Sequence, residues 1–572
     1  MASNGAVAKI LSEIGIYLEM QGVPFKPRAY ERAAEAVLGL EGDIQELYRS
    51  GGLKALEAMP GIGVSIAEKI EEMITTGRVK YYEELKKKTP VDIEGLQRVE
   101  GIGPKSIKKL YEKLGIRNLK DLETAARKGT IGKLAGFGKK TEDNILKGIG
   151  FIKTSSGRFS LGFAMQEIRS IEERLKNVHE VRRLTVAGSI RRRRETIGDV
   201  DILATSAHPK KVMDFFVGMP EVVRVYAKGG TKASVRMRSG IDIDLRVVPE
   251  GSYGAALNYF TGSKEHNVAL RTLAEKKGMK LNEYGLFRGK KRVAGASEEE
   301  IYRALGLEYI EPEMREDKGE IELARSHKLP NLVGYGDLRG DLQIQTDWTD
   351  GSASIEAMAK AALSRGLEYI AITDHTKGLA MTGGLDEKKI LKQMAEIDRV
   401  NKKLRGRIKV LKGTECDILK DGSLDLPDRV LARLDVVGVA VHSRFKMSRK
   451  EQTERIVRAI SSRNVDILFH PTGRIIQQRE PYDVDIDALI AAARRTGTIL
   501  EIDAQPARLD LKDEHVKRCV EAGVKMSIDS DAHSPQHIEY LEYGIAQARR
   551  GWAERRDIVN AWPLEKMLQF LK

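Results

Sequence analysis

The spacing of apolar residues changes along this chain, and that change constrains its fold more than any other feature of the sequence. Up to about residue 150, short amphipathic segments such as 7–20 and 81–88 are separated by glycine pairs, which is typical of short helices. From about residue 185, β-branched runs such as 200–204 and 241–248 are separated by turns. We therefore expect an all-α first region followed by an α+β core.

A third pattern follows residues 312–335, which lack clear periodicity and have the proline and glycine content of a linker. Beyond them, short apolar runs alternate with helical segments. The runs cover residues 369–372, 436–441, 467–470, 499–502 and 525–527. This alternation predicts an α/β barrel or a related parallel sheet. The chain has 572 residues, too many for one ordinary hydrophobic core, so several domains are expected.

The charge of the chain is unevenly distributed. Lys and Arg outnumber Asp and Glu by 97 to 83. Residues 336–572 hold 39 basic and 37 acidic side chains, which leaves 58 and 46 for residues 1–335. A basic first part of this kind favours a polyanionic partner.

Cysteine content and hydropathy indicate the cellular compartment. The two cysteines, Cys416 and Cys519, cannot form a disulfide framework, and the first residues do not resemble a signal peptide. No uninterrupted apolar run approaches the length that spans a bilayer. We expect a reduced, cytoplasmic protein with no membrane partner.

Three Gly-x-Gly turns in the first region each precede an amphipathic segment. Their glycines are Gly61 and Gly63, Gly101 and Gly103, and Gly136 and Gly138. Glycine allows a tight turn, and the helix N-terminus that follows has free N–H groups that can bind a phosphate. Helix capping would explain one such turn equally well, but not three of them. The turns resemble helix-hairpin-helix motifs, which implies sequence-independent binding of the DNA backbone, with Lys105 beside the second turn and K⁺ or Na⁺ at the turn carbonyls.

A pair of carboxylates indicates phosphoryl-transfer chemistry. Asp199 and Asp201 are two residues apart on a predicted strand, so both side chains point to one face, and Asp244 follows on a later strand. Three such carboxylates repel each other unless cations lie between them. Two Mg²⁺ ions held there would lower the pKa of an attacking hydroxyl and neutralise a departing pyrophosphate. The pattern alone does not choose between Asp244 and Asp242, which lies on the same face.

The motifs around these carboxylates resemble those of the family X nucleotidyltransferases, the DNA polymerase beta-like enzymes, through about residue 310. The resemblance is carried by Gly188-Ser189, Arg192, Gly198 to Asp201, Asp244, Arg246 and Tyr259 to Ser263. It favours Asp244 over Asp242, because Leu245-Arg246 follows Asp244. It implies that Asp199 and Asp201 bind both Mg²⁺ ions, for which Mn²⁺ can substitute. Asp244 would bind the catalytic metal and help to deprotonate the primer 3′-hydroxyl.

The same resemblance implies a pocket for an incoming deoxynucleoside triphosphate. Its members are Arg158, Gly188, Ser189, Arg192, Gly198, Arg246, Tyr259, Phe260, Gly262 and Asn267. Ser189 and the two guanidinium groups of Arg158 and Arg192 would hold the triphosphate. Tyr259, Phe260 and Gly262 would crowd the sugar and discourage ribonucleotides, and Asn267 would contact the base or the sugar.

Near the N-terminus, Tyr30 and Lys69 match positions that family members use to bind a 5′-phosphate and to remove deoxyribose phosphate through a Schiff base. A lysine acts as an amine nucleophile when its neighbours lower its pKa. Phe25 and Ser65 stand where this pocket would have a histidine and a lysine. The resemblance therefore favours 5′-phosphate binding over lyase activity.

Six of the ten histidines lie after residue 336, most of them directly after predicted strands, where an α/β barrel collects its active-site loops. They and nearby carboxylates form a ligand set for two or three Zn²⁺ or Mn²⁺ ions. The set is Asp350, His375, Glu415, His442, His470, Asp531 and His533. This segment resembles the polymerase-and-histidinol-phosphatase (PHP) domain, which implies 3′-to-5′ exonuclease or abasic-site endonuclease activity.

One motif departs from the PHP pattern. The domain normally opens with a His-x-His pair, and this chain has Gln343 and Gln345 instead. An amide oxygen is a weaker zinc ligand than an imidazole, so one metal position is expected to be lost or loosened. Three alternatives stay open: a nuclease with altered metal demand, a weak nuclease, or a structural domain. We favour residual metal binding.

Together the motifs predict a multidomain chain with an all-α helix-hairpin-helix region, an α+β palm and a C-terminal α/β distorted barrel. The expected domains are a lyase-like helical DNA-binding domain at 1–85, a second helical DNA-binding subdomain at 86–155, a nucleotidyltransferase palm at 156–255, a nucleotide-selection subdomain at 256–315, a linker at 316–335 and the PHP domain at 336–572.

The function expected from this order of motifs is a DNA-directed DNA polymerase that fills gaps during base-excision or end-joining repair. Its partners would be gapped or nicked duplex DNA and dNTPs, and it would act as a monomer near the nucleoid of a prokaryote. Two alternatives from other classes are a repair nuclease targeted by its polymerase-like half, and a non-catalytic scaffold that binds DNA ends. The three clustered aspartates argue against a scaffold, since such a protein needs no carboxylates beside a polyanion.

Overall fold

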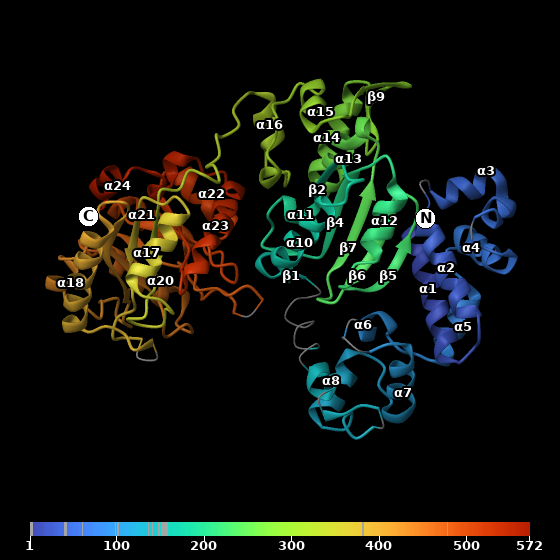
Figure 1. Cartoon of the computed structure of the whole chain (residues 1–572), viewed down its shortest axis with the longest axis horizontal. Helices are drawn as coiled ribbons and strands as arrows, with labels where there is room; N and C mark the ends of the chain where they lie inside the picture. Colours follow the sequence, from blue (N-terminus) through green and yellow to red (C-terminus); the bar gives the residue numbers. More distant parts are fainter. Residues whose placement is uncertain are drawn as a thin grey trace.

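The computed structural model contains a helical N-terminal region, a central sheet with a second small lobe, and a C-terminal barrel (Figure 1). The residues that it describes are 4–38, 40, 43–59, 61–97, 99, 102–134, 136–139, 141–146, 149, 158–379, 382–477 and 479–571. Gly101, one of the predicted DNA-binding glycines, lies outside the described residues.

The described part of the first region is all-α, as predicted. Its helices are α1 (Asn4–Met20), α2 (Lys26–Leu38), α3 (Ile44–Glu57), α4 (Val64–Thr76), α5 (Lys80–Lys88), α6 (Ile93–Gln97), α7 (Pro104–Leu114) and α8 (Leu119–Arg127). Apolar residues spaced at helical intervals, such as Leu11, Ile14 and Ile70, form one buried cluster. Side chains cap the N-terminus of some helices: at the start of α3, the Asp43 carboxylate accepts a hydrogen bond from the Gln45 backbone N–H at 2.8 Å.

The central domain is built on a five-stranded sheet. Its order is β2 (Arg183–Val186), β4 (Asp199–Thr205), β7 (Asp242–Val247), β6 (Lys232–Met237) and β5 (Val222–Lys228). Buried and half-buried residues alternate along β6 and β7, so one face of the sheet is apolar. Helices α10 (Leu161–Lys176) and α12 (Pro209–Val217) pack on that face through residues such as Ile168 and Phe216. The polar face is left for chemistry, and α13 (Tyr253–Thr261) covers one end of it.

The small lobe follows directly. It contains α14 (Lys264–Lys276), the antiparallel strands β8 (Lys280–Asn282), β9 (Gly285–Arg288) and β10 (Lys291–Ala294), and α15 (Glu298–Ala304). Its core includes Leu270 and Tyr302. The segment 316–335, expected as a linker, contains helix α16 (Glu320–Arg325), and Ile321 and Ala324 of that helix belong to the same core. The lack of clear periodicity in the sequence arises because α16 has only 6 residues.

In the part of the C-terminal domain that the structure describes, seven parallel strands follow one another in chain order, which confirms the predicted α/β architecture. The strands are β11 (Gly340–Ile344), β12 (Tyr369–Ile372), β13 (Lys409–Asp417), β14 (Val436–Ala440), β15 (Ile467–Leu468), β16 (Ile499–Asp503) and β17 (Met526–Asp529). Outside them lie helices such as α17 (Ile355–Ser364), α18 (Glu387–Leu404), α20 (Arg449–Ile460), α21 (Ile486–Thr496), α22 (Asp513–Ala522) and α23 (Leu541–Arg550). A bridge between Ile344 and Ala532 brings the two edge strands together, so the barrel is nearly closed. Within the described ranges, no helix is both long and apolar enough to cross a membrane.

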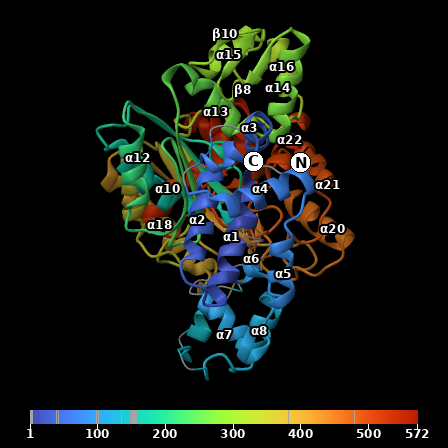
Figure 2. The same ribbon diagram turned by 90° about the vertical axis from the view of Figure 1, so that its right-hand side faces the viewer.

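The barrel packs against the central domain and the small lobe. Leu509 and Tyr543 of the barrel belong to the apolar cluster of the central sheet, and Trp552 belongs to that of the small lobe. A Cβ atom built on Gly162 of α10 would lie 2.2 Å from Pro506, so the backbones approach closely there. Figure 2 shows the N-terminal helices on the side of the central domain away from the barrel.

Candidate active site

The predicted catalytic carboxylates come together on the polar face of the central sheet. In the parallel pair of β4 and β7, Asp199 is aligned with Asp242 and Asp201 with Asp244. Aligned residues of parallel strands point to the same face, so four carboxylates lie on one side. This is the face opposite to α10 and α12, because Val200 and Ile243 point toward those helices.

Neighbouring side chains distinguish Asp242 from Asp244, a choice that the residue pattern left open. Arg236 of β6 donates to both carboxylate oxygens of Asp242, at 2.8 Å each, in a bidentate ion pair. Asp244 accepts one hydrogen bond at 2.5 Å, from the hydroxyl of Ser234. Among the described residues, no ion pair is formed by Asp199, Asp201 or Asp244. Three unpaired carboxylates therefore remain on this face.

The three carboxylates suit a divalent cation. Burial, followed by repulsion from Asp199 and Asp244, raises the pKa of Asp201 to about 7. A cation at this position would offset the repulsion, and carboxylate oxygens are preferred ligands of Mg²⁺ and Mn²⁺. Gly188 lies against Asp201 with φ of 67°, and a Cβ atom there would be 3.1 Å from an oxygen of Asp201. A larger residue at position 188 would therefore crowd the carboxylates.

Arg192 ends the short helix α11 (Gly188–Arg191), whose first residue lies against Asp201 and which also carries Ser189. Its Nη1 donates to the carbonyl of Thr261, and a Cβ atom built on Gly262 would lie 3.0 Å from Nη1. Gly262 has φ of 70°. The structure thus brings the turn at residues 188–192 into contact with the predicted sugar-contacting segment 259–263, some 70 residues away in sequence.

Of the other predicted nucleotide-binding residues, Arg246 and Asn267 contact the segment 259–263, and Arg158 lies at the start of β4. Arg158 donates to the hydroxyl and the carbonyl of Thr196, at 3.0 and 2.5 Å, and its guanidinium lies next to Gly198. The guanidinium carbon of Arg246 is 4.5 Å from the ring centroid of Phe260. The Asn267 amide donates to the carbonyl of Tyr259 at 2.7 Å. Their roles toward a nucleotide stay predictions.

A buried charge cluster beneath this region was missed at the sequence level. Glu298 accepts from Arg191 at 2.6 Å and from Arg315 at 2.5 Å, and all three residues are largely buried. Burial opposes ionisation of Glu298, but the charges of Arg315 and Arg191 outweigh it and lower its pKa to about 2. The sequence contains no local signal for the cluster, because Glu298 begins a run of three glutamates that reads as an ordinary helix N-terminus.

The Gly-x-Gly turns have one shared geometry. Gly63 and Gly103 cap helices α4 and α7 with nearly identical backbone angles, φ of −92° and −95°, and no described side chain occupies either cap. Gly61 and Gly136 have φ of 83° and 86°. The apolar residue between the two glycines is buried in each turn, while Gly61, Gly63, Gly136, Gly138 and Lys105 are exposed. The helix N–H groups therefore face solvent, where a phosphate could reach them.

The predicted lyase residues lie in one part of the N-terminal region. The Lys69 ammonium donates to the carbonyl and hydroxyl of Ser65, at 2.9 and 3.1 Å, and lies 5.2 Å from the ring centroid of Tyr81. Tyr30 is buried, and burial raises its pKa to about 12. Phe25 is 90% exposed.

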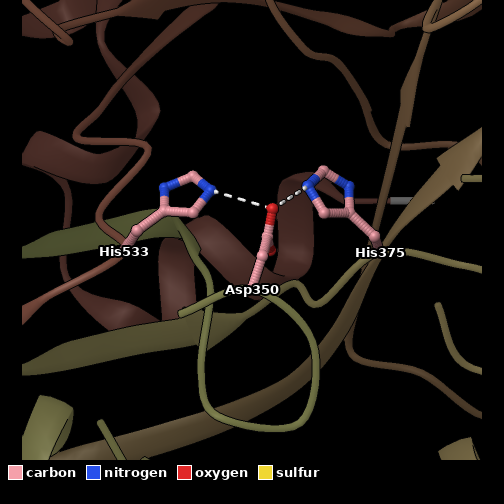
Figure 3. A group of neighbouring side chains, drawn as sticks. All are labelled: Asp350, His375 and His533. Carbon is pink, nitrogen blue, oxygen red and sulfur yellow. Dashed lines mark ion pairs between the residues drawn. The ribbon is translucent and has the colours of Figure 1, made fainter. Parts of the chain in front are cut away.

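The barrel gathers its predicted metal ligands at the C-terminal ends of its strands. Two groups have ligand atoms within 4.8 Å of one another: Asp350, His375 and His533, and His375, Glu415 and His442. In Figure 3 the Asp350 carboxylate lies between the imidazoles of His375 and His533, and each Nε2 atom is 3.6 Å from Asp350 Oδ2. His442 and His470 approach Glu415 Oε1 at 3.1 and 2.9 Å.

Asp417 contacts a candidate metal ligand, and the sequence did not indicate this. Its carboxylate lies 2.6 Å from His442 Nδ1 and so orients the imidazole that faces Glu415. Burial opposes protonation of His442, but Asp417 and Glu415 outweigh it and raise the pKa of His442 to about 10. A cation between His442 and Glu415 would replace the proton that these carboxylates attract.

The two glutamines lie in the barrel where the first histidine pair was expected. Both Nε2 atoms donate to Glu415 Oε2, Gln343 at 3.1 Å and Gln345 at 2.8 Å. Both residues are fully buried, and their Oε1 atoms have no hydrogen-bond partner among the described residues. Two predicted ligands, His470 and Asp531, lie outside both metal groups: His470 approaches Glu415, and Asp531 lies 3.9 Å from Arg508 Nε. The donor set thus fits cations at two positions that share His375, and the amide N–H groups of the two glutamines face Glu415, a member of the group with His375 and His442.

Comparison with protein families supports this division of the chain. Residues 2–79 match the helix-hairpin-helix domain, 93–150 a SAM-like helix-hairpin-helix tandem, 256–316 the DNA polymerase beta thumb, and 341–560 the PHP domain. The helix-hairpin-helix and thumb domains indicate DNA as a partner, and both the polymerase and the PHP families depend on metals.

Similar proteins cover the same parts. The "DNA polymerase/3'-5' exonuclease PolX" of Bacillus subtilis is 37% identical over 571 residues, 99% of each chain. The DNA polymerase lambda of Arabidopsis thaliana is 29% identical over 301 residues, 46% of this chain and 53% of its own. A protein of Thermoanaerobacter sp. described as a probable phosphatase is 31% identical over 230 residues, 38% of this chain and 88% of its own. This chain belongs to the family X DNA polymerases that carry a C-terminal PHP domain.

Proposed function

We propose that this chain is a DNA-directed DNA polymerase that fills short gaps during base-excision or end-joining repair. The observation that carries the proposal is the set of unpaired carboxylates Asp199, Asp201 and Asp244 on one face of the sheet, beside the arginine-bearing turn at residues 188–192. Asp242 shares this face but is already paired with Arg236. A carboxylate cluster without internal cations suits a site that takes its positive charge from bound metal ions.

The residues of the site would divide the work. Asp199, Asp201 and Asp244 would hold two Mg²⁺ ions, or Mn²⁺ in their place, which when bound activate a hydroxyl and stabilise the charge of a departing pyrophosphate. Asp244, with Oδ1 bonded to Ser234, keeps Oδ2 for the proton of the primer 3′-hydroxyl.

The pocket residues would bind the dNTP. Ser189, Arg192 and Arg158 would hold the triphosphate, and Tyr259 and Phe260 would contact the sugar. The ring of Phe260 is fixed between Arg246 and Tyr259, whose centroid is 5.0 Å away. An aromatic pair in this position would exclude a 2′-hydroxyl by shape.

The exposed glycine turns would hold a gapped or nicked duplex by its backbone, with K⁺ or Na⁺ at the turn carbonyls. Such binding positions the DNA without reading its sequence. The chain would act as a monomer in the cytoplasm of a prokaryote, near the nucleoid. At Lys69 we propose 5′-phosphate binding.

Primer extension tests this function. On a duplex with a short gap, the protein and Mg²⁺ are expected to add template-directed dNTPs until the gap is filled, and to do so more efficiently with a 5′-phosphate at the downstream end. A single-stranded template without the downstream strand is the control. Failure to extend the gapped primer with either Mg²⁺ or Mn²⁺ would refute the proposal.

A second candidate function is metal-dependent removal of 3′ nucleotides by the barrel, favoured by the two ligand groups that share His375. The cations there would be Zn²⁺ or Mn²⁺. We expect His375→Ala to lower the metal content of the purified protein at both positions and to abolish 3′-end shortening. His537→Ala is the matched control, since His537 lies beside His533 but in neither group. Metal content measured by mass spectrometry that is equal in both variants would contradict this assignment.

A further inference from the structure

Two neighbouring groups orient the guanidinium of Arg192, which lies in the turn at residues 188–192. Arg192 Nε lies 3.2 Å from Glu316 Oε1, and Nη1 donates to the Thr261 carbonyl. No described residue pairs with the third nitrogen, Nη2. Two of the three guanidinium nitrogens thus orient the group, and the third remains for a ligand.

The residue that orders Glu316 belongs to the barrel. Arg550, the last residue of α23, donates Nη1 to Glu316 Oε1 at 3.0 Å and to the backbone carbonyl of Arg192 at 2.8 Å. Its Nη2 donates to Asp513 of the barrel at 2.7 Å. Arg550 is only 4% exposed, so it is tied into the barrel and also contacts both Arg192 and its partner.

Electrostatics keep this network charged. Burial would raise the pKa of Glu316, but the guanidinium groups of Arg550, Arg192 and Arg194 outweigh burial and lower the pKa. Glu316 is therefore a carboxylate shared by arginines on both sides of the domain boundary. Without Arg550, Glu316 would keep Arg192 and Arg194 as cationic partners. The Glu316 side chain would then be free to move together with that of Arg192.

We infer that Arg550 is a positioning residue for nucleotide binding, through which the barrel holds Arg192 in the orientation that binds the triphosphate. Arg550 acts through Glu316 and through the Arg192 backbone and does not touch the nucleotide. The inference rests on the proposed function of Arg192. It gives the barrel a role in polymerisation that is independent of metal binding in the barrel.

The adjacent residue provides a matched control. Arg549 is also on α23, is 8% exposed, and pairs with Glu313 at 2.8 Å and with the carbonyl of Val333 at 3.1 Å. Like Arg550, it joins the barrel to the segment that follows the small lobe through a buried ion pair. Among the described residues, it forms no hydrogen bond with Arg192 and no ion pair with Glu316.

The test compares Arg550→Met, Arg550→Lys and Arg549→Met in the full chain, with kcat and KM for a dNTP measured on a gapped primer. Hydrogen bonds to charged groups of this kind support an expected increase in KM of roughly tenfold for Arg550→Met, with a smaller change in kcat. Arg550→Lys should raise KM for the dNTP less than Arg550→Met does, because an ammonium can still pair with Glu316. Arg549→Met should leave KM near the wild-type value.

An unchanged KM in Arg550→Met would overturn the inference. An equal increase of KM in Arg549→Met would also overturn it, because it would show a general loss of packing between the barrel and its neighbours. Thermal unfolding of each variant identifies any that fails to fold, and Arg550→Lys then provides the comparison. If the wild-type protein does not extend primers, the proposed function fails. The inference is then tested by calorimetry: dNTP binding should be weaker in Arg550→Met than in Arg549→Met.

Discussion

Asp244→Asn is expected to abolish primer extension, lowering kcat on a gapped primer by about 10³-fold or more, because coordination of the catalytic cation contributes several kcal/mol to transition-state stabilisation. No described cationic side chain forms an ion pair with Asp244, which is aligned with Asp201 in the parallel pairing of β4 and β7. The amide of Asn is isosteric but has only one weak ligand oxygen. Primer extension with Mg²⁺ and with Mn²⁺ measures the effect.

Asp242→Asn is the matched control for Asp244→Asn. Asp242 lies two residues away on the same face, but its carboxylate is occupied by Arg236. The pair is partly exposed, so its loss should cost at most about 1 kcal/mol of stability and leave kcat within a few fold of wild type. Loss of activity in Asp242→Asn together with retained activity in Asp244→Asn would show that the catalytic assignment is reversed.

The second large effect is on stability. Glu298→Gln is expected to lower the free energy of unfolding of the small lobe by about 3–5 kcal/mol, because it leaves Arg315, which is fully buried, without its carboxylate. Arg191, which also pairs with Glu298, loses its partner at the same time. Differential scanning calorimetry of the full chain should show the transition of this lobe at a lower temperature.

Glu299→Gln removes a neighbouring carboxylate that is exposed, and its effect should stay within about 0.5 kcal/mol. The two variants change the same group at adjacent positions, so net charge and helix N-terminal effects are matched. Equal unfolding temperatures for the two would mean that the buried cluster does not stabilise the lobe. Because Arg191 precedes Arg192, Glu298→Gln should also raise KM for the dNTP.

Much of the fold could be predicted because its determinants are local. Period-two alternation in β4 puts Asp199 and Asp201 on one face, and glycine turns mark the starts of α4 and α7. Apolar runs followed by histidines indicated where the barrel strands end. Each of these signals lies within a window of about ten residues, so the local structure that it predicts does not depend on how distant parts of the chain pack.

The candidate site could be predicted less completely. The residue pattern left Asp242 and Asp244 equivalent, and the family resemblance favoured Asp244; the ion pair that sets Asp242 apart involves Arg236, on an adjacent strand whose register no local pattern gives. In the barrel, the same limit applies to Asp417, which orients His442, and to the two glutamines, whose amides face Glu415 only because β11 and β13 pack into one barrel.

The sequence by itself determined the order of the domains, the face on which the candidate catalytic carboxylates lie and the positions of most candidate ligands, because residue spacing and turn chemistry act over short distances. Only the tertiary structure decided which charges are paired. Arg550 and Glu316 are 234 residues apart, and Arg192 and Arg550 are 358 apart. Their contact depends on how the barrel packs against the small lobe and the central domain, where a buried charge must find a partner that local sequence does not specify.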